Sequence, residues 1–80
     1  MNSFKSQNQN ALSKKYVLKI RDEYLLELGM WSRFTRFIYY AQRFDTFEEA
    51  ENAKTELCDE NYYHNFSENQ VEIVPIEIKV

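Results

Sequence analysis

The first regular pattern in the chain is an alternation of apolar and polar residues. Tyr16, Leu18 and Ile20 share one parity, whereas Lys19 and Arg21 take the other. Alternation with a period of two is typical of a strand that buries one face. The pattern therefore predicts a first strand over residues 16–20.

A second strand is predicted over residues 24–31, paired antiparallel with the first and with its even-numbered residues facing inward. Residues 21–23 connect the two strands and lack the Asn-Gly or leading Gly of the tightest hairpins. We therefore expect a short loop built around a type I turn.

Residues 33–44 carry apolar side chains on both parities. Their β-branched and aromatic content favours a third strand. A helix is the alternative, because Phe34, Phe37, Ile38 and Ala41 also fit a helical stripe. In the strand interpretation, the chain turns at Asp45 and enters a helix directly.

The clearest local signal is a helix start at Thr46. Thr46 and Glu49 have the spacing of a capping box, in which each side chain accepts a hydrogen bond from the other residue's backbone N–H. The helix is expected to run to about Glu60, or to fray after Leu57. Its predicted apolar flank consists of Phe47, Ala50, Ala53, Leu57 and Cys58.

Residues 61–70 are predicted to form a loop, and residues 71–80 a closing strand. The alternation in this strand changes phase, because Val71 and Ile73 share one parity and Ile76 and Ile78 the other. A proline lies at the change. The pattern predicts an edge strand with a bulge and a kink at Val74 and Pro75.

Together these elements predict an α+β fold, with a small antiparallel sheet of three to four strands and one helix packed on one face (β-β-β-α-β). Residues 15–80 are expected to form this single domain. Residues 1–14 are polar and cannot bury enough apolar surface to offset their ordering entropy. They are expected to form a flexible tail.

Composition limits the compartment and the chemistry. The chain has 80 residues and one cysteine, Cys58, which is expected to be a small buried apolar residue. No intramolecular disulfide is available, and no apolar run approaches the ~18 residues of a membrane span. We therefore expect a cytoplasmic protein with no membrane partner.

No catalytic or metal-binding motif accompanies this fold. The single histidine, His64, lies in the predicted loop without the Cys or His partners that a zinc site needs. No nucleophile is paired with a base. The prediction is a protein that is not an enzyme and carries no cofactor.

Charge is distributed unevenly along the chain. Residues 1–44 carry a net charge of +5 and residues 45–80 a net charge of −8, which together make the total of −3. Asymmetry of this kind points to charged partners, or to two elements that neutralise each other once folded.

Three interaction surfaces follow from this distribution. Carboxylates along the helix form a candidate protein-binding face: Glu48, Glu49, Glu51, Glu56, Asp59 and Glu60. Aromatic and basic residues form a candidate nucleic-acid-binding run: Trp31, Arg33, Arg36, Tyr39 and Arg43. Apolar residues of the last strand form a candidate homodimer edge: Ile76, Ile78 and Val80.

Three segments carry a resemblance to a known group of proteins: residues 16–20, the junction 41–50 (Ala-Gln-Arg-Phe-Asp-Thr-Phe-Glu-Glu-Ala) and residues 71–74 (Val-Glu-Ile-Val). The chain resembles small accessory proteins of phages and prophages of Gram-positive bacteria. The resemblance implies a protein that binds a host macromolecule, most often a protein. Anti-CRISPR inhibition of a Cas nuclease is the most specific form of this expectation. The residues themselves leave two alternatives, which are binding of RNA or single-stranded DNA through the basic and aromatic run 31–44, and a self-associating structural module.

Overall fold

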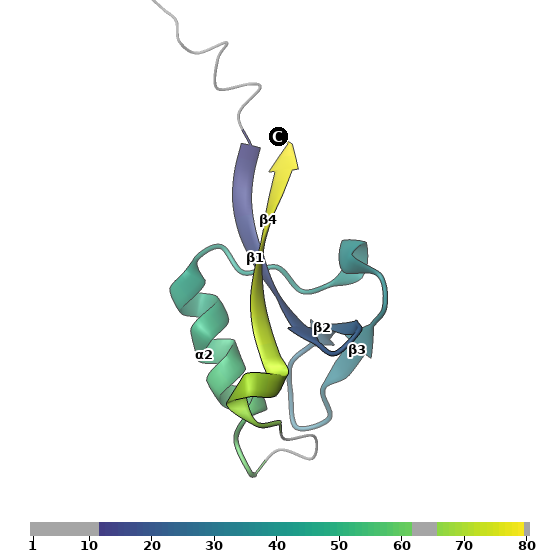
Figure 1. The fold of residues 1–80 in the computed structure, drawn as a ribbon, viewed down its shortest axis with the longest axis vertical. Helices are drawn as coiled ribbons and strands as arrows, with labels where there is room; N and C mark the ends of the chain where they lie inside the picture. The colour runs from purple at the N-terminus through teal and green to yellow at the C-terminus, as the bar shows by residue number, and fades with distance from the viewer. Residues whose placement is uncertain (1–11, 62–65, 80) are drawn as a thin grey trace, which may run out of the picture.

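A computed structural model describes residues 12–61 and 66–79 of the chain. Four antiparallel strands form one sheet in the order β3-β2-β1-β4, and helix α2 packs on one face of β1 and β4 (Figure 1). The α+β fold predicted from the sequence is confirmed. Its elements are β1 (Leu12–Ile20), β2 (Glu23–Glu27), β3 (Arg33–Thr35), η1 (Ile38–Tyr40), α2 (Phe47–Leu57), η2 (Glu68–Gln70) and β4 (Val71–Lys79).

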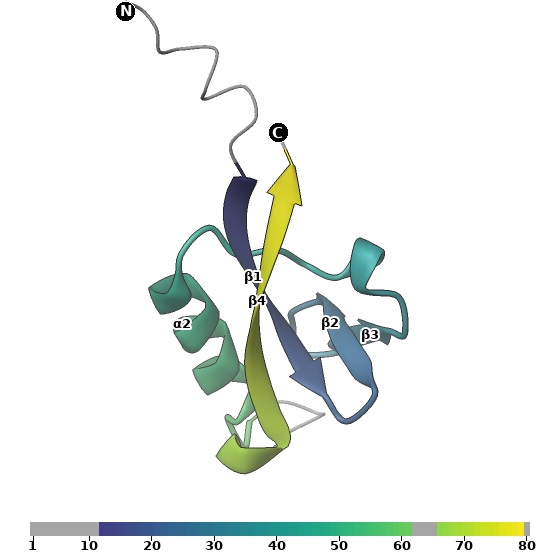
Figure 2. The ribbon, with the colours of Figure 1, turned by 45° about the horizontal axis from the view of Figure 1, so that its top comes forward.

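The pairing of β1 with β4 is the longest in the sheet. It runs from Leu12 opposite Lys79 to Ile20 opposite Val71 without a change of register. The distal end of this two-stranded ribbon extends beyond α2 (Figure 2). Because β4 supplies partners this far, β1 begins three residues before the predicted domain start at residue 15. Residues 1–11 of the predicted tail lie outside the described residues.

Pro75 lies within β4 without a bulge, so the bulge and kink predicted there are wrong. The N–H of Tyr16, which is opposite Pro75, donates to the C=O of Phe44 at 3.0 Å, and its C=O accepts from the N–H of Phe44 at 2.8 Å. Both groups of Tyr16 therefore point away from β4. In an antiparallel ladder, the nitrogen of Pro75 must then point to the free edge, where no N–H is needed. The predicted edge position is confirmed.

This geometry predicts opposite outcomes at neighbouring positions of β4. Pro75→Val should change the free energy of unfolding by no more than about 0.5 kcal/mol, because no ladder hydrogen bond is involved. Val74→Pro should cost about 1–3 kcal/mol or more, because the lost N–H points to β1 and leaves a carbonyl unpaired. Urea unfolding followed by circular dichroism at low protein concentration measures both. Equal losses for the two variants would show that the edge is assigned to the wrong side.

The turn between β1 and β2 is tighter than predicted. Ile20 pairs with Glu23, so the loop contains only Arg21 and Asp22. Arg21 has a φ of 61° and is the only non-glycine residue with positive φ in the described part of the chain. Positive φ at the first central residue is a feature of type II′ turns, whose twist matches that of the flanking strands. The type I prediction is wrong because strand twist overrides the absence of glycine.

The tight turn also decides which face of β2 is buried. Pairing of Ile20 with Glu23 places odd-numbered residues of β2 on the same face as even-numbered residues of β1. Leu25 is accordingly fully buried, whereas Tyr24 and Leu26 are half-buried. The prediction that even-numbered residues of the second strand point inward is wrong. That strand also ends at Glu27 and does not reach residue 31.

Backbone strain at Arg21 gives a second testable consequence. Arg21→Gly should stabilise the protein by about 1 kcal/mol, because a side chain at positive φ costs about that much. Arg21→Ala removes the same charge and keeps the strain, so it is the matched control. The difference in free energy of unfolding between the two variants isolates the strain. An Ala variant as stable as the Gly variant would contradict the left-handed conformation.

Helix α2 and the sheet enclose the core. Two small residues, Ala50 and Ala53, let the helix lie close to the strands, as predicted. Phe47 of the predicted apolar flank packs on Tyr16 of β1 but stays 48% exposed. The helix ends at Leu57, which leaves Asp59 and Glu60 beyond its C-terminus. The core consists of Leu18, Ile20, Leu25, Phe44, Ala50, Ala53, Leu57 and Val71.

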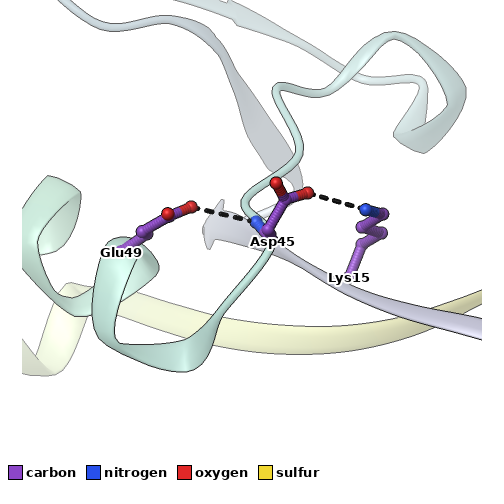
Figure 3. Close-up of polar contacts among 3 residues, drawn as sticks. All are labelled: Lys15, Asp45 and Glu49. Atoms are coloured by element: carbon purple, nitrogen blue, oxygen red, sulfur yellow. Dashed lines mark hydrogen bonds and ion pairs between the residues drawn. The ribbon is translucent and has the colours of Figure 1, made fainter.

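The start of α2 is capped by Thr46 and by Glu49, and Figure 3 shows the contacts of Glu49 and Lys15 with Asp45. The Oγ1 of Thr46 accepts a hydrogen bond from the N–H of Glu49 at 3.1 Å. The Oε1 of Glu49 accepts from the N–H of Asp45 at 3.1 Å, one residue before the partner predicted by the capping box. The Asp45 carboxylate also pairs with the Nζ of Lys15 at 2.6 Å. The helix start is thus tied to β1.

Residues 33–44 form neither a long strand nor a helix. Only Arg33–Thr35 are in β3, and its pairing with β2 ends where Thr35 lies opposite Tyr24. The chain then forms η1 and returns to the sheet. There the N–H of Gln42 donates to the C=O of Leu25 at 2.8 Å, and Phe44 pairs with Tyr16.

Candidate binding surface

Large exposed apolar side chains are concentrated in one part of the chain. Their exposed fractions are 56% for Met30, 67% for Trp31, 59% for Phe37, 75% for Tyr39 and 66% for Tyr40. Large apolar residues elsewhere in the described chain are buried or half-buried, apart from Phe47. Small proteins seldom leave this much apolar surface together unless it contacts something.

Phe37, Tyr39 and Tyr40 form what we call the aromatic lobe. Their rings meet edge to face, with centroids 6.0 Å apart for Phe37 and Tyr40 and 6.5 Å apart for Tyr39 and Tyr40. The N–H of Tyr40 donates to the C=O of Phe37 at 3.0 Å, which closes the turn of η1. Buried Ala41 and half-buried Ile38 anchor the turn, so the three rings project outward.

Two arginines flank the aromatic lobe. Arg36 and Arg43 are exposed, and neither makes an ion pair or a hydrogen bond through its side chain within the described residues. Arg33 differs, because its Nη1 lies 3.2 Å from Oε1 of Glu27. The lobe therefore combines three exposed rings with two unpaired guanidinium groups.

The structure divides the predicted nucleic-acid-binding run into two groups. Arg36, Tyr39 and Arg43 lie on the connection between β3 and α2 that carries the aromatic lobe. Trp31 lies in the turn between β2 and β3, and the length of β3 separates it from η1. Phe37 was missed as a surface residue, because a buried aromatic and an exposed one give the same sequence pattern.

The predicted acidic face is exposed but does not form one site. Glu48, Glu49 and Glu51 lie in the first half of α2, and the Glu49 carboxylate caps the helix start. Glu56 lies near its end, and the other two acidic residues follow it. Among the described residues, no group of three or more His, Cys, Asp and Glu side chains is placed to hold a metal ion.

A groove of about 790 Å³ runs between α2 and β4. We call it the α2–β4 groove. Phe47, Val71 and Ile73 contribute apolar surface to it, and η2 closes one end with Glu68 and Asn69. The remaining lining residues are polar or charged and are Glu51, Asn52, Lys54, Thr55 and Glu72.

Cys58 follows the last residue of α2 as a half-buried free thiol. Burial raises the pKa of the Cys58 thiol, Glu68 raises it further, and Lys54 acts in the opposite direction. A raised pKa keeps the sulfur protonated and a poor nucleophile at neutral pH. The predicted packing role fits this environment. His64 lies outside the described residues.

The predicted dimer edge lies on the outer side of the sheet. Ile76 and Ile78 of β4 are half-buried, and Val80 lies outside the described residues. Pro75 removes one donor from the outward row of backbone groups. Proline at an exposed edge discourages pairing with another strand. The fold thus gives this edge partial protection against self-pairing.

Comparison with known proteins does not assign a function to these surfaces. No family model, no curated protein and no solved structure matches the chain. Helices in the described residues are all too short or too polar to cross a membrane. The resemblance to small phage proteins stays a prediction.

Proposed function

We propose that this protein is a non-catalytic binding domain that docks on another protein through its aromatic lobe and the flanking residues Arg36 and Arg43. The exposure of Phe37, Tyr39 and Tyr40 carries the proposal. Aromatic residues and arginine are enriched at the centres of protein interfaces, where they supply most of the binding energy.

The lobe is suited to binding because its backbone is already ordered before a partner binds. Backbone hydrogen bonds close η1, and the bonds of Gln42 and Phe44 hold the chain on its C-terminal side. Fully burying one large apolar side chain is favourable by about 1.5–3 kcal/mol. A pre-ordered turn loses less of this gain to conformational entropy than a flexible loop does.

A protein partner fits the lobe better than a nucleic acid. Single-stranded nucleic acids bind where stacked aromatic rings accompany a row of cations along the phosphates. The lobe has the rings but only two unpaired arginines, and the whole chain carries a net charge of −3. Many exposed rings with few cations favour an apolar contact with a protein, to which the guanidinium groups add a few specific hydrogen bonds.

The predicted acidic residues lie on α2 and just after it, and α2 is across the molecule from η1 (Figure 1). They were the predicted protein-binding surface, and the lobe replaces them as the primary site in this proposal. A phage-encoded role in a bacterial cytoplasm, with inhibition of a Cas nuclease as its most specific form, stays a prediction. It agrees with a small domain that exposes a preformed contact surface.

The proposal predicts that Tyr39→Ser/Tyr40→Ser weakens partner binding and keeps the fold. Tagged protein is used to capture partners from lysate of a Gram-positive host with and without nuclease, and affinity for the purified partner is then measured by calorimetry. The double variant should lose at least about tenfold in affinity, since truncating a central aromatic residue costs 2 kcal/mol or more. Trp31→Ser, which removes an exposed ring outside the lobe, is the matched control.

Three results would contradict this assignment. Loss of all recovery after nuclease treatment would indicate binding of nucleic acid. A partner retained by the Tyr39/Tyr40 variant but lost by Glu48→Lys/Glu60→Lys, which lies outside the α2–β4 groove, would return the site to the acidic face of α2. Equal losses for the lobe variant and the Trp31 control would show that the lobe has no special role.

A further inference from the structure

We propose that the α2–β4 groove is a second docking surface, which takes an extended, positively charged segment of another protein. It lies on α2 and β4 and shares no residue with the aromatic lobe. The proposal therefore goes beyond the function assigned to the lobe.

The apolar part of the groove is preformed. Phe47 is half-exposed, and its ring packs edge to face on Tyr16 with centroids 5.8 Å apart. Val71 is buried, and half-buried Ile73 lies beside it on the same face of β4. An apolar or aliphatic part of a bound side chain thus meets a fixed surface next to the start of α2.

The charged residues of the groove are mostly acidic. Glu51, Glu68 and Glu72 line it together with one cation, Lys54. None of the three carboxylates makes an ion pair or a hydrogen bond with another described residue. Unpaired carboxylates around an apolar surface attract lysine and arginine, whose aliphatic stems cover the apolar part. They repel acidic segments and nucleic acids.

The free edge of β4 selects an extended conformation. The backbone groups of Ile73 have the same parity as Pro75 and point away from β1. Val71 donates its N–H to the C=O of Glu68, and Pro75 has no N–H. Pairing is therefore limited to a short bridge at Ile73. The same molecule already contains a bridge of this kind, in which Phe44 pairs with Tyr16 outside the named strands.

The test uses a short, doubly capped peptide that alternates lysine with threonine around one central valine and carries a fluorophore. Fluorescence anisotropy measures its binding to the full chain. We expect saturable binding that weakens as salt is added. Glu51→Lys/Glu68→Lys should reduce the affinity at least about tenfold. Glu48→Lys/Glu60→Lys changes the net charge equally outside the groove and should leave the affinity within about twofold.

Equal losses for the two double variants would overturn the proposal, because net charge alone would then explain binding. Lack of saturable binding by the folded, unaltered chain would also overturn it, as would equal binding of a peptide with glutamate in place of lysine. Tyr39→Ser/Tyr40→Ser should bind the peptide normally. This variant separates failure of the groove from failure of the lobe.

Discussion

The backbone hydrogen bonds of Tyr16 are the interaction on which the rest of this small fold depends. Its N–H and C=O both bond to Phe44, while β4 passes on its other side with Pro75 opposite. The ring of Tyr16 also supports Phe47 at the start of α2. Each hydrogen bond contributes only about 1 kcal/mol net. Together they join the central strand, the connection after β3 and the helix at one residue.

This junction explains why the aromatic lobe is exposed. The connection between β3 and α2 is held at Thr35 by β2 and at Phe44 by β1, so the residues between must form a loop. The core under α2 is already filled by Phe44 and by seven residues from other parts of the chain. Tyr39 and Tyr40 lie in this loop, outside that core. Their exposure therefore follows from topology, and the proposed function uses a surface that the fold cannot bury.

Sequence periodicity predicted the helix, its Thr46 cap and the succession of elements along the chain, because these depend on local patterns. The predictions failed where the pairing between strands decides which side chains are buried. The buried parity of β2 depends on the two-residue turn at Arg21, and no glycine marks that turn. The phase change near Pro75 looked like a bulge, yet it arises because α2 covers β4 only at the end that contains Val71 and Ile73. Neither interaction surface was predictable as a unit, because the lobe and the groove each combine residues whose exposure is set by tertiary contacts.

The central claim is that the Tyr16 junction holds the connection that carries the lobe in a fixed position. Native-state hydrogen exchange measured by NMR tests this directly, because it reports the protection of single amides. The amides of Tyr16, Gln42 and Phe44 donate to backbone carbonyls and should exchange slowly. The amide of Arg43 makes no hydrogen bond within the described residues and should exchange rapidly. Exchange of Gln42 and Phe44 as fast as that of Arg43 would contradict the account, because the lobe would then be carried by a mobile loop.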